Sequence, residues 1–188
     1  MSEAAAAKIA VLAVGNVLMQ DDAVGPYVLA ELVSRFEMPS QVRIEDLGTP
    51  GLDLHPHLMD LDAAVFIDAI QSTDAPGTVR RLDRGQLLAA APAQRTGGHD
   101  PALREALLAL EFNGRAPKEI FLIGIVPAAT SYVTGLTEPV REAVEQAVAM
   151  VVDTLRDLGH APRRRPEALP VDNWWEHADP SSRNETRL

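Results

Sequence analysis

The sequence predicts an α/β fold with a mainly parallel, twisted sheet of about five strands and helices on both of its faces. Three observations point to this fold. Short apolar runs of strand length alternate with segments of helical periodicity along the first 159 residues. Several of these runs are unbroken, as in IAVLAV and AAVFI, which is typical of strands buried on both faces. A strand–helix–strand order favours parallel pairing, because the helix carries the chain back across the sheet.

The predicted strands share a short length and an apolar or alternating character. In chain order they are residues 8–15, 41–46, 63–69, 78–82 and 119–126. The predicted helices share apolar side chains at helical spacing. In chain order they are residues 23–36, 52–59, 100–110 and the segment between Thr137 and Gly159.

Residues that commonly cap helices stand at several of the predicted helix ends. Asp21 or Asp22 can cap the helix at 23–36, and Pro26 fits its first turn, where a missing N–H costs nothing. Thr137 is expected to cap the last helix, and Gly159 is expected to end it.

The chain is expected to divide into an α/β domain at 1–159 and a C-terminal tail at 160–188. The tail is rich in Pro and Arg, has no clear period and contains both tryptophans, Trp174 and Trp175. Such a composition predicts a segment that is either disordered or docked on the body. The two tryptophans can belong to a docking peptide for a partner protein, or the tail can be a solvated extension.

The composition argues against several classes of function. The absence of cysteine excludes disulfides, thiolate metal sites and a cysteine nucleophile. A net charge of −10 disfavours nucleic acid and anionic membranes as partners. The first apolar run is too short for a signal peptide or a membrane span, so we expect a cytoplasmic protein. The sequence has no G-x-G-x-x-G, phosphate-loop, G-x-S-x-G or H-E-x-x-H motif, and we expect no organic cofactor.

Three side chains are expected to meet at the carboxyl ends of the strands, where open α/β sheets bind their ligands. Asp22 follows the first strand, Asp68 lies near the end of the third, and His99 follows a double glycine and precedes a helix. Two carboxylates and an imidazole suit a divalent transition metal such as zinc or nickel. Three protein ligands would leave positions open for substrate or water.

Each of these three residues also has a structural interpretation. Asp22 can be a helix cap, and His99 can be an ordinary loop residue. Asp68 can accept a structural hydrogen bond, although a carboxylate inside an apolar strand is costly when it is unpaired. His55 and His57 are expected at the surface, because side chains two residues apart do not face one way on a helix.

Residues beyond the second strand are candidates for the same cleft. Asp46 ends that strand, and Gly48 and Thr49 follow it. Asp46 can contact substrate or support the metal-contacting residues, or it can simply initiate a turn, as aspartate often does.

The segment IAVLAVGNVLMQDDAVGPYVLAEL resembles the opening of the hydrogenase maturation endopeptidases, which process the large subunit of nickel–iron hydrogenases. Four further segments agree with that family in the same order. They are EDLGTPG, VFIDAI, APGTVRRL, and IFLIGIVP followed by GLTEPV. The resemblance covers about residues 8–158.

The resemblance implies a phosphorylase/hydrolase-like three-layer sandwich and an aspartic-type endopeptidase. It places the family's two metal-contacting acids at Asp22 and Asp68 and its histidine at His99. Asp21 then most simply caps the helix. EDLGTPG resembles the family's D-G-G-T-x-G turn, with Leu47 where glycine is usual.

The implied reaction is the hydrolysis of one peptide bond near the C-terminus of a hydrogenase large-subunit precursor. The nickel would belong to the precursor, and Asp22, Asp68 and His99 would check that it has been inserted. The metal can assist hydrolysis by activating a bound water molecule or by polarising the carbonyl of the cleaved bond. Alternatively, the nickel can serve only for recognition of the precursor. We expect the protease to act as a monomer.

Two other function classes stay open on the sequence alone. A metal-dependent hydrolase of another substrate would use the same three residues. In a noncatalytic nickel-binding or nucleotide-binding module, Asp68 would instead have a structural role. The sequence does not rank Glu31, Glu45 and Asp46 as candidates for a general base.

Overall fold

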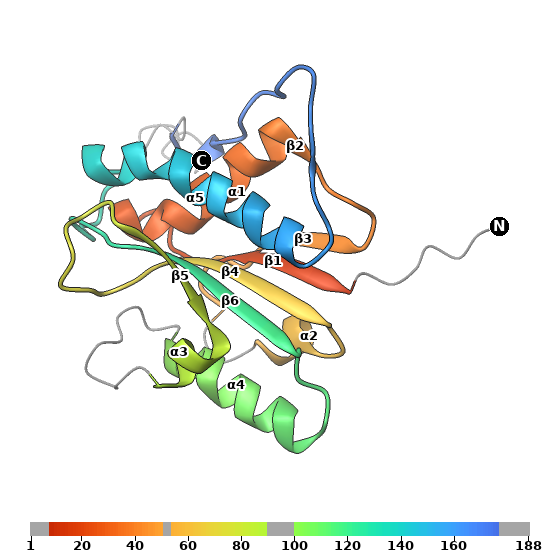
Figure 1. Ribbon diagram of the computed structural model, residues 1–188. Coiled ribbons are helices and arrows are strands. Elements are labelled where there is room, and N and C mark those ends of the chain that lie inside the picture. Colours follow the sequence, from red (N-terminus) through yellow and green to blue (C-terminus); the bar gives the residue numbers. More distant parts are fainter. Residues whose placement is uncertain (1–7, 51–53, 90–99, 177–188) are drawn as a thin grey trace, which may run out of the picture.

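The predicted α/β sheet is present and has five strands in the order β3-β1-β4-β6-β5 (Figure 1). The computed structural model describes residues 8–50, 54–89 and 100–176. Four strands run parallel and β5 pairs antiparallel with β6, so the predicted fold class is confirmed. The strands are β1 (Ile9–Ala13), β3 (Val42–Asp46), β4 (Ala63–Ala69), β5 (Val79–Asp83) and β6 (Glu119–Ile125).

Helices cover both faces of the sheet and make the molecule three layers thick (Figure 1). One face packs against α1 (Val24–Arg35) and α5 (Glu138–Asp157). The other face packs against α2 (His55–Leu58), α3 (Arg84–Ala89) and α4 (Asp100–Phe112). A 3₁₀ turn, η1 (Gln20–Ala23), leads from the β1 loop into α1.

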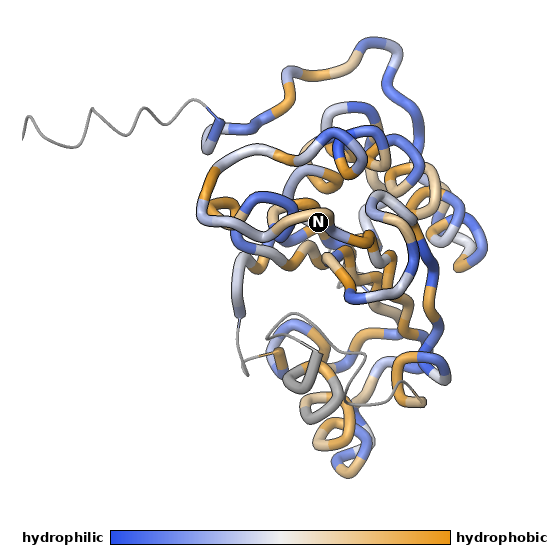
Figure 2. The backbone as a smooth tube through the Cα atoms, turned by 90° about the vertical axis from the view of Figure 1, so that its left-hand side faces the viewer, coloured by the Kyte–Doolittle hydropathy of each residue, from blue (hydrophilic) through white to orange (hydrophobic). Residues whose placement is uncertain are grey.

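The side-chain alternation of the strands divides the core into two clusters. Val65 and Ile67 of β4 belong to the cluster under α1 and α5, whereas Ala64 and Phe66 belong to the cluster under α2 and α4. In Figure 2 hydrophobic segments gather in the middle of the molecule, whereas hydrophilic segments are common along its periphery. The unbroken apolar runs of the sequence are therefore explained by burial on both faces.

The predicted side-chain cap of the first helix is wrong. Neither η1 nor α1 has a side-chain cap hydrogen bond, so neither Asp21 nor Asp22 caps the first helix. Thr137 does occupy the N-cap position of α5, but its hydroxyl makes no cap bond. The reason is that both Asp21 and Thr137 are committed to tertiary contacts, which are described below.

The tail lies against the body over the part that the structure describes. β7 (Arg163–Arg164) pairs antiparallel with β2 (Phe36–Glu37), beside the end of α1 (Figure 1). Further along, a 3₁₀ turn, η3 (Trp174–Glu176), places Trp175 in the α1–α5 cluster with 5% of its surface exposed. Over residues 163–176 the tail is docked on the body through these contacts, although most of its side chains are exposed. The division of the chain at residue 160 stays a prediction.

None of the helices in the described part of the chain is both long enough and apolar enough to cross a membrane.

Candidate active site

The carboxyl ends of β1, β3 and β4 bring the predicted acids to one edge of the sheet. The strand register places Ala13 beside Asp46 on one side and beside Ile67 on the other. Asp68 is the next residue after Ile67. Because neighbouring strands are about 4.8 Å apart, Asp46 and Asp68 lie roughly 10 Å apart along this edge.

Two glycines allow the start of α1 to sit close to this edge. A Cβ atom on Gly25 would overlap with the carbonyl oxygen of Val14 and would lie 2.6 Å from that of Ile67. A Cβ atom on Gly15, whose φ is +148°, would overlap with the carbonyl oxygen of Asp22. Only glycine permits either approach. The backbone of the loop carrying Asp22 is thereby held against the end of β1, and the first turn of α1 against the residue before Asp68.

Asp21 is fully buried and holds the loop between β6 and α5. Its carboxylate accepts hydrogen bonds from the N–H groups of Ala128, Ala129 and Thr137, at 2.8, 3.0 and 2.7 Å. The Thr137 hydroxyl donates a fourth hydrogen bond at 2.8 Å. Four donors compensate the loss of hydration that burial imposes on a carboxylate. Asp21 is therefore a structural anchor, and this replaces its predicted role as a cap.

Asp22 is half-buried and faces a different set of groups. Its Oδ2 accepts a hydrogen bond from the N–H of Asn16 at 2.9 Å, which closes the loop between β1 and η1. The Asn16 side chain in turn accepts a hydrogen bond from the N–H of Leu18 at 3.0 Å. One N–H donor does not use all the acceptor capacity of a carboxylate, so Asp22 retains lone pairs that a cation can share.

Asp68 is half-buried in the penultimate position of β4. Its Oδ1 accepts a hydrogen bond from the N–H of Ala69 at 2.8 Å. By the alternation along β4, Asp68 lies on the face covered by α2 and α4. Helix α4 begins at Asp100, one residue after His99 in the sequence.

His99 lies outside the described residues, so its predicted place beside Asp22 and Asp68 stays a prediction. Within 8–50, 54–89 and 100–176, no group of three or more His, Cys, Asp or Glu side chains is arranged to hold a metal ion. The two described acids nevertheless fit the expected donor set, because carboxylate oxygens bind divalent transition metals when a third ligand completes the site.

The turn after β3 has the form expected of an aspartate-initiated turn. Asp46 is exposed, and its Oδ1 accepts a hydrogen bond from the N–H of Gly48 at 2.9 Å. Gly48 has a φ of +56°, and its carbonyl oxygen accepts a hydrogen bond from the N–H of Gly15 at 2.8 Å. Thr49 is exposed beside it. The turn that begins at Asp46 is therefore hydrogen-bonded to the loop that carries Asp22.

Two candidates for a general base are engaged in ion pairs. Glu45 lies 2.7 Å from Nδ1 of His57 and 3.0 Å from Nε of Arg43. Glu31 lies 3.4 Å from Nε of Arg35, one turn along α1. These contacts explain both glutamates and His57 without catalysis.

Some residues around the site give no local signal in the sequence. Asp21 and Thr137 are 116 residues apart, and no spacing rule connects them. The same holds for Tyr27 and Glu176, which are joined by a hydrogen bond across 149 residues. An acid next to Asp22 in an otherwise apolar segment is the one feature that could have indicated a buried anchor.

Comparison with known proteins gives one consistent result. The HycI model of the hydrogenase maturation protease family matches residues 26–154. The Hydrogenase 2 maturation protease of Escherichia coli K12 is 35% identical over 153 residues, which are 81% of this chain and 93% of that protein. The HupD hydrogenase expression/formation protein of Rhizobium leguminosarum bv. viciae is 32% identical over 97% of this chain and 91% of its own.

Solved structures agree with the sequence matches. The hydrogenase maturating endopeptidase HybD from E. coli superposes with a TM-score of 0.77 at 33% identity, covering 84% of this chain and 98% of its own. The nickel–iron hydrogenase maturation protease HybD from Thermococcus kodakarensis superposes with a TM-score of 0.63 at 27% identity, covering 78% and 98%. The chain therefore belongs to the hydrogenase maturation protease family, and it is a peptidase, an enzyme of the hydrolase class.

Proposed function

We propose that this protease removes a C-terminal extension from the large-subunit precursor of a nickel–iron hydrogenase after nickel has been inserted. The observation that carries the proposal is the position of Asp22 and Asp68 at the carboxyl edge of the sheet. The close approaches of Gly15 and Gly25 hold the loop of Asp22 and the start of α1 at that edge. Family membership supports the reaction class, and this geometry supports the site.

In this proposal the nickel is part of the substrate, not a resident cofactor. Asp22 and Asp68 supply carboxylate oxygens, and His99 supplies an imidazole nitrogen. Such oxygen and nitrogen donors bind nickel, but less tightly than thiolates do. A chain without cysteine can therefore test for nickel in the precursor without removing it. Submicromolar affinity of the isolated protease for nickel would count against this role.

The contacts of the two acids suggest how the check works. The Asn16 N–H holds Asp22 at one oxygen, and the Ala69 N–H holds Asp68 at one oxygen. Each side chain is thus oriented in advance, which lowers the entropy lost on binding. A loaded nickel at this edge would bring the neighbouring peptide bond to the same place and polarise its carbonyl or a water molecule.

The proposal extends to the setting of the reaction. The precursor and the protease would meet in the cytoplasm, with the protease acting as a monomer. In this proposal the protease is an aspartic-type endopeptidase, because its active site uses the carboxylates of Asp22 and Asp68 and no serine or cysteine nucleophile.

The test is a processing assay with purified protease and two preparations of one precursor, nickel-loaded and nickel-free. Loss of the C-terminal extension is followed by mass spectrometry of the intact precursor. The proposal expects cleavage of the loaded form alone. Equal cleavage of both forms would show that the protease does not check for nickel. If neither form of the cognate precursor is cleaved, a hydrolase of another substrate on the same scaffold is favoured.

A further inference from the structure

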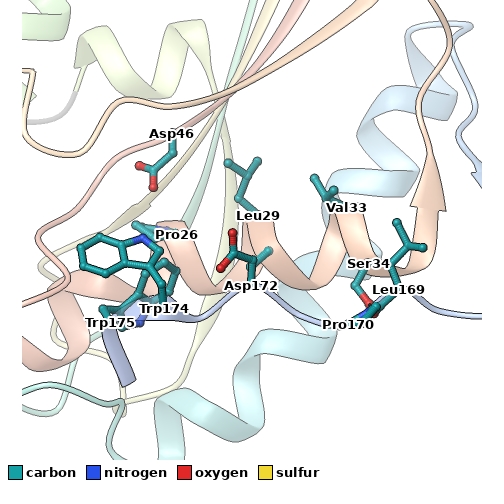
Figure 3. Close-up of a pocket in the computed structure, with 11 residues that line it drawn as sticks. Pro26, Leu29, Val33, Ser34, Asp46, Leu169, Pro170, Asp172, Trp174 and Trp175 are labelled. Carbon is teal, nitrogen blue, oxygen red and sulfur yellow. The ribbon is translucent and has the colours of Figure 1, made fainter. Parts of the chain in front are cut away.

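A pocket of about 260 Å³ lies between α1 and the C-terminal tail, next to the predicted site. Figure 3 shows α1 side chains between Asp46 on one side and the tail on the other. The pocket is lined by apolar side chains of both segments, including Leu29, Val33 and Leu169, and by Trp174. Its volume is below the range of about 300–1,000 Å³ that is usual for drug-sized ligands, so it suits one long side chain.

The polar part of this lining is acidic. Asp46 enters from the end of β3, and Asp172 enters from the tail (Figure 3). Within the residues that the structure describes, neither carboxylate is paired with an Arg or Lys side chain. An apolar wall with two unneutralised carboxylates and an aromatic ring complements a cation on an aliphatic stem.

The tail wall of the pocket is held in place by specific contacts. The Ser34 hydroxyl donates a hydrogen bond to the carbonyl oxygen of Leu169 at 2.5 Å, and the N–H of Leu169 donates to the carbonyl oxygen of Ser34 at 2.9 Å. Trp175 packs edge-on against Tyr27, with their ring centroids 5.3 Å apart. Trp174 is left 61% exposed beside this anchor and is free to contact a ligand.

We propose that this pocket binds an arginine or lysine side chain of the precursor, and that the precursor peptide runs in an extended conformation across the sheet edge. The inference rests on the proposed function, since it assigns a recognition element to the same substrate. Asp46 lines the pocket and also ends β3 at the edge that carries Asp68. The strand register places Asp46 on the α1 face of the sheet and Asp68 on the opposite face, so the pocket lies next to this edge and a peptide that reaches both must cross it. An extended peptide advances about 3.3 Å per residue, and the roughly 10 Å between Asp46 and Asp68 places the basic residue at least three positions from the cleaved bond.

The first test measures binding without cleavage. A capped alanine heptapeptide with one central arginine is titrated into the protease, and the indole N–H resonance of Trp174 is followed by NMR, with Trp174→Phe used for assignment. The proposal expects a saturable shift at millimolar peptide. The shift is expected to be absent with glutamine in place of arginine and to weaken about fivefold in Asp172→Asn. No shift with arginine, or equal shifts with both peptides, overturns the proposal.

The second test measures cleavage and uses a matched charge control. Asp172→Lys and Glu167→Lys change the net charge equally, and both positions are exposed in the tail, but Glu167 does not line the pocket. The proposal expects Asp172→Lys to raise KM for the loaded precursor about tenfold with kcat unchanged, and Glu167→Lys to leave both unchanged. Equal effects of the two variants, or a loss in kcat alone, overturn it.

The two tests separate failure of the pocket from failure of the proposed function. If the wild-type protein cleaves no precursor, the proposed function fails, and the peptide titration still decides whether the pocket binds a basic side chain. If the wild-type protein cleaves the loaded precursor and Asp172→Lys behaves like Glu167→Lys, the pocket proposal fails alone.

Discussion

Asp21 and Asp22 are neighbours in the sequence but lie in different environments. Asp21 is fully buried among four hydrogen-bond donors, whereas Asp22 is half-buried with one backbone donor. The buried aspartate fixes the loop between β6 and α5 against η1, whereas its neighbour holds the loop that follows β1. The pair therefore separates a buried structural anchor from the residue that we propose contacts the nickel of the precursor.

This division predicts that the same substitution destabilises the protein by different amounts at the two positions. Asp21→Asn places an amide N–H₂ group against buried donors and is expected to lower the free energy of unfolding by about 3 kcal/mol. Asp22→Asn keeps an acceptor for the Asn16 N–H and is expected to lower it by less than about 1 kcal/mol. Urea unfolding followed by circular dichroism measures both. Equal losses would show that Asp21 is not the anchor.

At the residue scale the sequence predicted which acids reach the edge but not what Asp21 does. Asp46 and Asp68 lie at the carboxyl ends of strands and Asp22 lies beyond one, and parallel topology alone brings strand ends together. The partners of Asp21 come from a loop more than 100 residues away, and only tertiary packing places them there. His99 keeps its predicted role without a structural test, because it lies outside the described residues.

At the scale of elements, the entry of α1 depends on the close approach of Gly25 to the ends of β1 and β4. Gly25→Ala is expected to lower the free energy of unfolding by about 3 kcal/mol or more, because the added methyl group meets backbone atoms that cannot move aside. Gly85→Ala is the matched control, since Gly85 is also the second residue of a helix and its Cβ would meet only the flexible Asp83 side chain, at 3.3 Å. Similar thermal unfolding of the two variants would contradict this account.

The contact between α1 and η3 predicts a dependence on alkaline pH. Burial and the hydrogen bond that its hydroxyl donates to Glu176, at 2.5 Å, raise the pKa of Tyr27 to about 12. An unfolded tyrosine has a pKa of about 10, so the folded protein retains this proton over an interval in which the unfolded chain loses it. The contribution of the neutral phenol is complete below pH ~10 and is lost as the pH rises toward ~12.

The expected result is a fall in the free energy of unfolding between pH ~10 and ~12 that disappears in Tyr27→Phe. Denaturant titrations at several pH values measure it. Tyr132→Phe is the control, because Tyr132 is 79% exposed. A fall that persists unchanged in Tyr27→Phe would assign the effect to other groups.

Element types were predictable where the apolar pattern is strong. β4 has the predicted range, and β1, β3 and β6 lie within theirs, because unbroken apolar runs have few alternatives to a buried strand. β2 and β7 were not predicted, since each has two residues and depends on pairing between segments far apart in the sequence.

At the scale of the whole molecule, the tail adds a wall to the body and contributes to its core. Trp175 is buried among α1 and α5 side chains, whereas its neighbour Trp174 is exposed. Trp175→Ala is expected to lower the free energy of unfolding by about 3–5 kcal/mol, and Trp174→Ala by no more than about 0.5 kcal/mol. Urea unfolding of the two variants checks the difference. Equal, small losses would mean that the tail is not part of the folded core.

The central claim is that Asp22, Asp68 and His99 act together on a nickel-loaded precursor. The most direct measurement is the single-turnover rate of extension loss from that precursor, compared between the wild-type protease and Asp22→Ala, Asp68→Ala and His99→Ala, each shown to be folded. We expect each variant to be slower by more than about 100-fold. Folded variants that cleave the loaded precursor at the wild-type rate would contradict the claim.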